Sequence, residues 1–262
     1  MKLLVLAALL LATPALADDL RDLCPDRPGQ GTPPCIVDKG HVLIEFGVGA
    51  FEHDKQPDSI TNSFTGGDVT ARLGLTDRLE VLAEWSAYNR VHERDRATGA
   101  TTTDHGVGDV LLGFKYSLAN PDGKGVSVAV QPFVTAPTAK SAIGAGGWTQ
   151  GIEVPVSIDL TDDLQLGLTP IIERLPDTLG SGHHAAYSLV TELDRALGPT
   201  TIGVELYASR DTDPGAHETQ ASFDVTLAQT VGKDLQLDGE VDAGLTHDTP
   251  DVRVLVGFAR RF

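Results

Sequence analysis

The sequence has no apolar run long enough to cross a membrane as a helix. Its one strongly apolar stretch, from Leu3 to Leu11, follows Lys2 and is too short for that purpose. The stretch ends at Ala15-Leu16-Ala17, a small-x-small cleavage site. A charged start, a short apolar core and such a site indicate a secretory signal peptide. We therefore expect residues 1–17 to be cleaved during export.

Cysteine is scarce, and both cysteines, Cys24 and Cys35, lie just after the expected cleavage site. In an exported protein such a pair predicts a disulfide, here closing a loop rich in proline and glycine. Two free thiols or a redox site are the alternative. We interpret residues 18–40 as a short periplasmic N-terminal segment rather than a domain, and the sequence leaves open whether it enters the rest of the protein.

Helical periodicity is also lacking, whereas apolar and polar residues alternate with period two in segment after segment. The clearest example runs from Leu235 to Leu245, with one apolar and one acidic face. This pattern predicts an all-β protein of twelve strands. The expected strands span residues 41–51, 64–75, 79–88, 106–118, 126–135, 149–160, 164–172, 183–197, 200–209, 218–230, 235–245 and 252–262.

The connections between these strands alternate in length. Even-numbered strands are followed by turns or by short connections, for example residues 76–78 and 198–199. Odd-numbered strands are followed by longer polar stretches: 52–63, 89–105, 136–148, 173–182, 210–217 and 246–251. Short turns at one end and long loops at the other are typical of an up-and-down antiparallel transmembrane β-barrel of the outer membrane. A soluble periplasmic β-sandwich or a lipocalin-like barrel is the alternative, although a sandwich has no reason to sort its loops in this way. We expect residues 41–262 to form the barrel.

If the apolar face of each strand meets lipid, the opposite face lines the lumen and carries many charges. Eleven of the fourteen candidate pore-lining residues are acidic. The candidates are Glu45, Arg72, Glu80, Glu84, Asp109, Lys115, Glu153, Glu192, Glu205, Asp224, Asp238, Glu240, Asp242 and Arg253. They could form an ion-paired network that plugs the barrel, or an acidic permeation path that favours cations. Inward glycines such as Gly74 would either make room in the lumen or relieve strand curvature.

Three sequence stretches resemble the outer-membrane proteins of the meta-pathway phenol-degradation family. These are residues 106–116 (GVGDVLLGFKY), residues 74–80 (GLTDRLE) and the closing part of the chain from Asp242 through Pro250-Asp251 to Ala259. The likeness covers about residues 41–262, and its motifs are moderately specific. It implies a transporter-like barrel for small, often aromatic or hydrophobic compounds. It supplies no catalytic residues, and we expect neither an enzyme nor a cofactor.

Other functions receive less support from the sequence. Seven of the eight histidines fall on or beside expected extracellular loops, next to several acids, so a metal site is conceivable. No ligand spacing such as His-x-x-x-His supports it, and we predict no metal.

Ser181 beside His183 and His184 is the nearest approach to a hydrolase site. A non-conducting structural barrel, or one that presents loops for adhesion, is the main alternative function. A formal charge of −17 without a basic patch argues against nucleic acid.

The chain ends on an aromatic residue, Phe262, after a strand whose even positions Val252, Val254, Val256 and Phe258 are apolar. We expect this strand to pair with the first one, because a barrel in lipid must have no open edge. Phe262 would then lie at the periplasmic rim and serve as the signal that the barrel-assembly machinery recognises. The expected partners are that machinery, outer-membrane lipid and a small-molecule solute.

Overall fold

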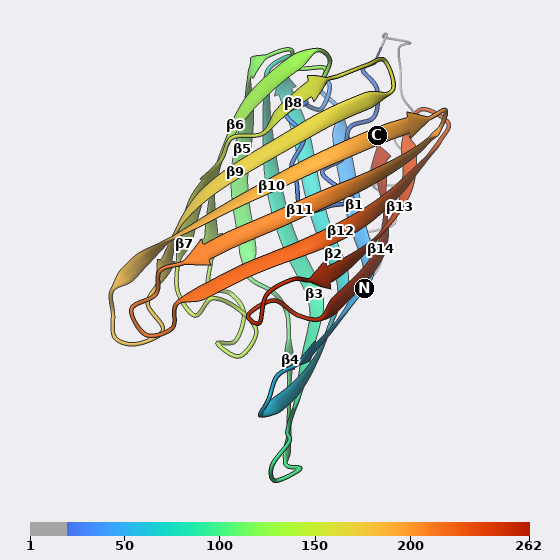
Figure 1. Ribbon diagram of the computed structural model, residues 1–262. Coiled ribbons are helices and arrows are strands. Elements are labelled where there is room, and N and C mark those ends of the chain that lie inside the picture. Colours follow the sequence, from blue (N-terminus) through green and yellow to red (C-terminus); the bar gives the residue numbers. More distant parts are fainter. Residues whose placement is uncertain (1–19) are drawn as a thin grey trace, which may run out of the picture.

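The computed structural model describes residues 20–262, which form a closed antiparallel β-barrel with a segment of chain inside it (Figure 1). The predicted signal peptide lies outside the described residues. Among the residues described, no helix is long and apolar enough to cross a membrane.

Fourteen β-strands are assigned within residues 20–262, and all their pairings in the barrel are antiparallel. They are β1 (Val42–Lys55), β2 (Ser59–Thr76), β3 (Leu79–Asp95), β4 (Thr101–Gly106), β5 (Val110–Ala119), β6 (Val126–Ala136), β7 (Thr149–Glu153), β8 (Val156–Asp159), β9 (Leu164–Pro176), β10 (His183–Leu197), β11 (Thr200–Asp211), β12 (Glu218–Val231), β13 (Leu235–Gly244) and β14 (Val252–Arg261).

The fourteen strands build a twelve-stranded barrel, because two barrel strands are each assigned as two pieces. Strand β4 continues β5 in one register along β3, where Glu84 pairs with Leu111 and Asn89 with Gly106. Strands β7 and β8 likewise share one register along β9 and are separated at Pro155, which has no N–H to donate. The predicted all-β fold with twelve barrel strands is confirmed.

The barrel closes between its last and first strands. Strand β14 pairs with β1 from Leu43 opposite Arg261 to His53 opposite Val252. The terminal Phe262 continues this ladder, since its N–H donates to the Val42 carbonyl at 2.8 Å and its carbonyl accepts from the Val42 N–H at 3.1 Å. The C-terminal residue is therefore part of the closing seam.

Two of the expected loops prove to be extensions of strands. Residues 52–63 and 89–105 were predicted as loops, but β1 and β2 pair as far as Lys55 opposite Ile60, and β3 pairs with β4 as far as Arg94 opposite Thr101. The connections shrink to residues 56–58 and 96–100, and the paired strands project beyond the barrel (Figure 1). The prediction was wrong there because a hairpin surrounded by water needs no apolar face. Its sequence therefore lacks the alternation of apolar and polar residues that identifies a strand.

The barrel has its apolar side chains outside and its charged side chains inside. Large exposed side chains on the outer face include Leu112, Phe114, Tyr116, Val225, Leu237, Val254 and Val256. Among the most buried side chains in the molecule are instead charged ones, with Arg72, Glu80, Lys115 and Asp224 at 0% exposure. This inversion of the usual globular pattern is what a lipid-facing barrel requires.

Candidate functional site

The N-terminal segment, residues 20–41, passes inside the barrel at the end where β14 finishes (Figure 1). A disulfide joins Cys24 and Cys35, whose Cα atoms are 6.4 Å apart, so the predicted bond is present. The segment has no regular secondary structure apart from one bridge between Lys39 and Gly74. Its backbone groups must therefore find their partners on the barrel wall.

A cluster of buried charges holds the disulfide loop against β1, β2, β3 and β5. Arg72 contacts three carboxylates: Asp26 and Glu80 at 2.8 Å and Glu45 at 3.1 Å. Lys115 Nζ also lies 2.8 Å from Asp26. Burial alone would raise the pKa of Asp26, but attraction to Arg72 and then to Lys115 holds it below its ordinary value. Asp26 is therefore the anion with which the segment binds both buried cations.

The same two cations bind backbone carbonyls of the segment. The Arg72 guanidinium donates to the carbonyls of Cys24 at 3.1 Å and Cys35 at 3.3 Å. Lys115 donates to the carbonyl of Pro33 at 3.0 Å. Arg72 thus contacts both ends of the disulfide loop, which explains why a full positive charge is retained at this buried position.

The carboxylates of the wall accept hydrogen bonds from N–H groups of the segment. Glu45 accepts from Asp26 and Arg27, and Glu80 accepts from Val37 at 2.6 Å. On the opposite wall, Glu240 accepts from Gly29 at 2.9 Å, and Glu205 accepts from Gln30 at 2.9 Å and Gly31 at 3.4 Å. A buried chain without secondary structure can therefore satisfy its amides on acidic side chains.

Two side chains of the segment reach the acidic wall formed by β11, β12 and β13. Arg27 pairs with Asp238 at 2.9 Å, and Gln30 donates to Ser222 at 3.1 Å and Asp224 at 2.9 Å. The segment therefore spans the lumen, from the cations on β2 and β5 to the acids on the far side.

Cavities lie on both sides of this crossing. A cavity of about 530 Å³ is lined by the segment and by β8 to β13, and a second of about 280 Å³ is lined by the segment with Glu84, Glu153 and Arg253. Both include segment residues between Asp26 and Thr32 in their walls. These residues form a partition within the lumen.

The acidic wall continues as a row across neighbouring strands. Glu192 pairs with Glu205, Glu205 with Asp224, Asp224 with Asp242, and Asp242 with Arg253. Within residues 20–262, one carboxylate oxygen on each of four acids is buried without a hydrogen-bond partner: Asp224 Oδ1, Asp238 Oδ2, Glu240 Oε1 and Asp242 Oδ1. Arg253, 3.4 Å from Asp242, is the cation of this row.

The structure brings eight of the fourteen candidate pore-lining residues into direct contact with the N-terminal segment. These eight are Glu45, Arg72, Glu80, Lys115, Glu205, Asp224, Asp238 and Glu240. Glu84, Glu153, Glu192 and Arg253 line the cavities, and Asp242 pairs with Arg253. Asp109 differs, because its two oxygens accept from Ala139 and Ala145 and hold the β6–β7 loop. A role of any of them in permeation stays a prediction.

Sequence reasoning missed the residues of the segment itself and the role of Arg261. Arg261 donates to the carbonyl of Arg21 at 2.7 Å and pairs with Asp38 at 3.1 Å, so it fixes both flanks of the segment at the closing seam. Gly74 leaves space for the segment, since a Cβ there would lie 2.2 Å from the Asp38 carbonyl oxygen. The adjacent opposite charges of Asp26 and Arg27 inside the cysteine loop were the sequence feature that could have indicated contacts with a charged lumen.

Ser181 does not form the arrangement that a hydrolase needs. Within the described part of the chain it makes no hydrogen bond with His183 or His184, and both ring nitrogens of His184 face aspartates instead. A serine without a base is a weak nucleophile.

The sequence profile of the family described as "Putative MetA-pathway of phenol degradation" matches residues 25–262. The match includes the part of the N-terminal segment that crosses the lumen, whereas the motifs pointed only to residues 41–262. None of the curated proteins is significantly similar to the chain in sequence.

Several solved structures share the barrel. An outer membrane channel from Pseudomonas putida F1 aligns over 90% of this chain and 99% of its own with a TM-score of 0.67 and 16% identity. The transport unit of the autotransporter AIDA-I from Escherichia coli aligns over 91% and 92% with a TM-score of 0.59 and 7% identity. The β domain of the Bordetella autotransporter BrkA aligns over 86% and 100% with a TM-score of 0.56 and 10% identity. At these identities the likeness establishes the fold alone.

Proposed function

The chain belongs to the phenol-degradation family just described, and from that premise we propose that it is an outer-membrane channel for small molecules whose lumen is constricted by its own N-terminal segment. The observation that carries this proposal is the pair of cavities, about 530 and 280 Å³, separated by residues 26–32. A barrel that served only as a scaffold would gain nothing from open space on both sides of a single chain crossing.

The outer membrane is the location that fits this exterior. The outward face is covered by exposed aliphatic and aromatic side chains, which a soluble barrel would bury. Export requires the predicted signal peptide to be cleaved before Asp18, and the oxidising compartment beyond it permits the Cys24–Cys35 bond. We further propose that Phe262 is the assembly signal, and its backbone hydrogen bonds to Val42 at the closing seam support this.

The solute class follows from the family and from the lumen. The family name refers to phenol degradation, so small aromatic compounds are the first solutes to test. Carboxylates line both cavities, and the larger one also has apolar lining residues such as Val156 and Leu164, which suits small molecules that carry a polar group. Phenol-sized molecules with a hydroxyl group agree both with the family description and with the polar lining of the cavities.

Single-channel recording in planar bilayers tests the proposal, with Arg27→Ala as the decisive variant. Arg27 reaches from the partition to Asp238 and lines both cavities. We expect small conductance steps for the wild type and larger steps for Arg27→Ala, because truncation widens the crossing. Arg78→Ala, at the exposed turn between β2 and β3, is the matched control and should conduct like the wild type.

A loop-presenting barrel is the second candidate function, and the projecting hairpins favour it. The β1–β2 and β3–β4 extensions stand clear of the barrel and would suit adhesion to a partner outside the cell (Figure 1). A purified barrel that shows heat-modifiable migration in detergent gels, yet neither conductance nor solute flux in any variant, would support this function and refute the channel.

A further inference from the structure

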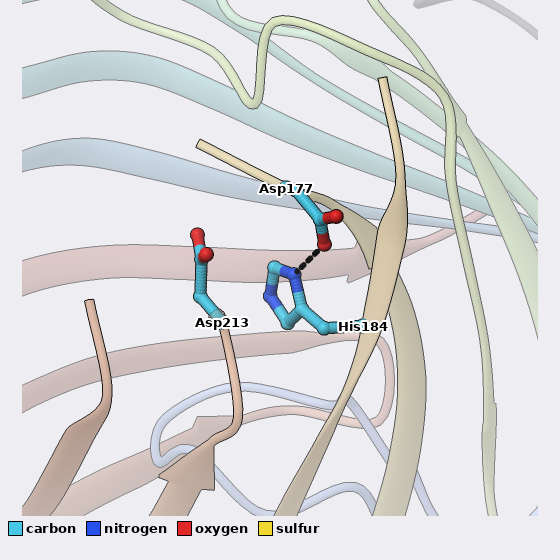
Figure 2. Close-up of side chains that lie close together, drawn as sticks. All are labelled: Asp177, His184 and Asp213. Atoms are coloured by element: carbon cyan, nitrogen blue, oxygen red, sulfur yellow. Dashed lines mark hydrogen bonds and ion pairs between the residues drawn. The ribbon is translucent and has the colours of Figure 1, made fainter. Parts of the chain in front are cut away.

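Four side chains gather at the opposite end of the barrel from Phe262, where β9, β10 and β11 reach their connecting loops. Asp177 follows β9, His184 is the second residue of β10, Asp211 ends β11, and Asp213 lies in the connection to β12. Figure 2 shows Asp177, His184 and Asp213. The His184 side chain is 6% exposed and Asp213 is 2% exposed. His184 has the parity of Glu192 on β10, so this group belongs to the inner face of the barrel mouth.

The hydrogen bond at one ring nitrogen fixes the tautomer of His184. Nδ1 lies 3.0 Å from Asp177 Oδ1, and a carboxylate only accepts, so Nδ1 carries the proton (Figure 2). A neutral ring then has its lone pair on Nε2. A carboxylate that orients a histidine through Nδ1 in this way is the usual support of a metal-binding imidazole.

Nε2 is buried and, within residues 20–262, has no hydrogen-bond partner. Asp211 Oδ1 is only 2.9 Å away, but it lies off the direction in which Nε2 would donate, so the short contact is not a hydrogen bond. Asp211 Oδ1 accepts the Asp213 N–H at 2.7 Å instead. An anionic oxygen this close to the Nε2 lone pair repels it unless a cation lies near both.

The spacing of these atoms suits a shared ion. Two ligand atoms that each lie about 2.1 Å from one metal are about 3.0 to 3.4 Å apart for octahedral to tetrahedral angles. The ring and the carboxylates of Asp177 and Asp213 all offer ligand atoms within 4.8 Å of one another. Nε2 is on the side of the ring nearer Asp213 (Figure 2).

Backbone hydrogen bonds stabilise the ionised carboxylate of Asp213. Its two oxygens accept from the Gly215 N–H at 2.8 Å and the Thr178 N–H at 2.9 Å, and these bonds hold its pKa below the ordinary value. They also join the β9–β10 loop to the β11–β12 loop. The carboxylate is therefore fixed in place before any ligand arrives.

We propose that His184 Nε2, Asp211 and Asp213 bind a divalent first-row transition-metal ion, such as Zn²⁺, with Asp177 as the positioning residue for the imidazole. One nitrogen and several carboxylate oxygens are donors that this class of ion accepts. The ion links β10, the end of β11 and the β11–β12 connection, so it fixes the mouth of the barrel independently of what the lumen conducts.

Zn²⁺ titration of chelator-treated protein in detergent, followed by calorimetry, tests this site. We expect one ion per barrel for the wild type and loss of that binding in His184→Ala and Asp213→Asn. Asp177→Asn keeps all proposed ligands and should weaken binding about ten- to hundredfold, as loss of an orienting carboxylate does. His183→Ala is the matched control, since His183 is exposed and adjacent on β10.

Two further measurements make every outcome decisive. X-ray absorption of the loaded protein should show one nitrogen ligand among oxygens, and heat-modifiable migration establishes that each variant is folded. Absence of binding by the folded wild type overturns the proposal and leaves His184 as a protonated bridge between Asp177 and Asp211. Equal binding by His184→Ala also overturns it, because the ion then lies on other surface groups.

Discussion

Arg72 shows how a charged residue becomes indispensable at a buried position. Its guanidinium contacts Asp26, Glu45 and Glu80 and two carbonyls of the disulfide loop, and the side chain is fully buried. Removing one partner of a buried ionic cluster leaves the others charged and without compensation, which costs more than the cluster itself contributes.

Arg72→Met should therefore lower the free energy of unfolding by about 3–5 kcal/mol. Urea unfolding in detergent measures this change. The matched control is Arg195→Met, because Arg195 and Asp163 form an exposed pair at 3.3 Å with side chains 64% and 47% exposed. An exposed pair contributes about 1 kcal/mol or less. Equal losses in the two variants would show that the lumen cluster is hydrated like the surface.

At the scale of elements, the sequence predicted strands wherever lipid imposes alternation and failed where it does not. The barrel strands were found because one face of each must be apolar. The tips of β1 to β4 stand outside that environment, and their pairing, such as His53 opposite Asn62, leaves no apolar signature. Backbone N–H groups of the N-terminal segment donate to Glu45, Glu205 and Glu240. Every residue except proline has such a group, so the sequence gives no signal of these contacts.

The alternation of side chains along the strands was enough to predict a charged lumen, but it did not predict which residues the charged side chains contact. Alternation placed Glu205 and Asp224 on one face of neighbouring strands, whereas their partner Gln30 comes from a segment without periodicity. Arg72 and Lys115 form ion pairs of the kind that a plugging network would use. Plugging and an acidic permeation path both stay hypotheses.

The closing element yields a prediction about assembly. Strand β14 pairs with β1 along its length, and Phe262 adds two backbone hydrogen bonds at the end of that ladder. Deleting Phe262 should reduce the yield of assembled barrel in cells severalfold while shifting the unfolding midpoint of the assembled fraction only slightly. Pulse-chase assembly and heat-modifiable gels measure the two effects. Removal of Asp18, which lies before the described residues, is the control of equal size. Normal assembly without Phe262 would exclude the signalling role.

At the scale of the whole molecule, charge is divided between two walls and the chain that crosses between them. Arg72 and Lys115 lie on one wall, and the row from Glu192 to Asp242 lies on the other. Asp26 pairs with both cations of the first wall, whereas Arg27 pairs with only one acid of the second, Asp238, so acids outnumber cations in the lumen. A solute in the lumen meets a net negative surface, which attracts cations and repels anions.

Ion selectivity should depend on the acids that face the cavity rather than on those bound to the segment. Glu84 and Glu153 both line the cavity of about 280 Å³, and Glu84 is exposed there. Replacing both by Gln removes the carboxylates and keeps side chains of nearly the same size and shape. We expect the wild type to prefer K⁺ over Cl⁻ in a salt gradient and the double variant to show a reversal potential closer to zero. Glu93→Gln, on the projecting hairpin, should leave the potential unchanged. An unaltered reversal potential in the double variant would mean that ions do not pass through this cavity.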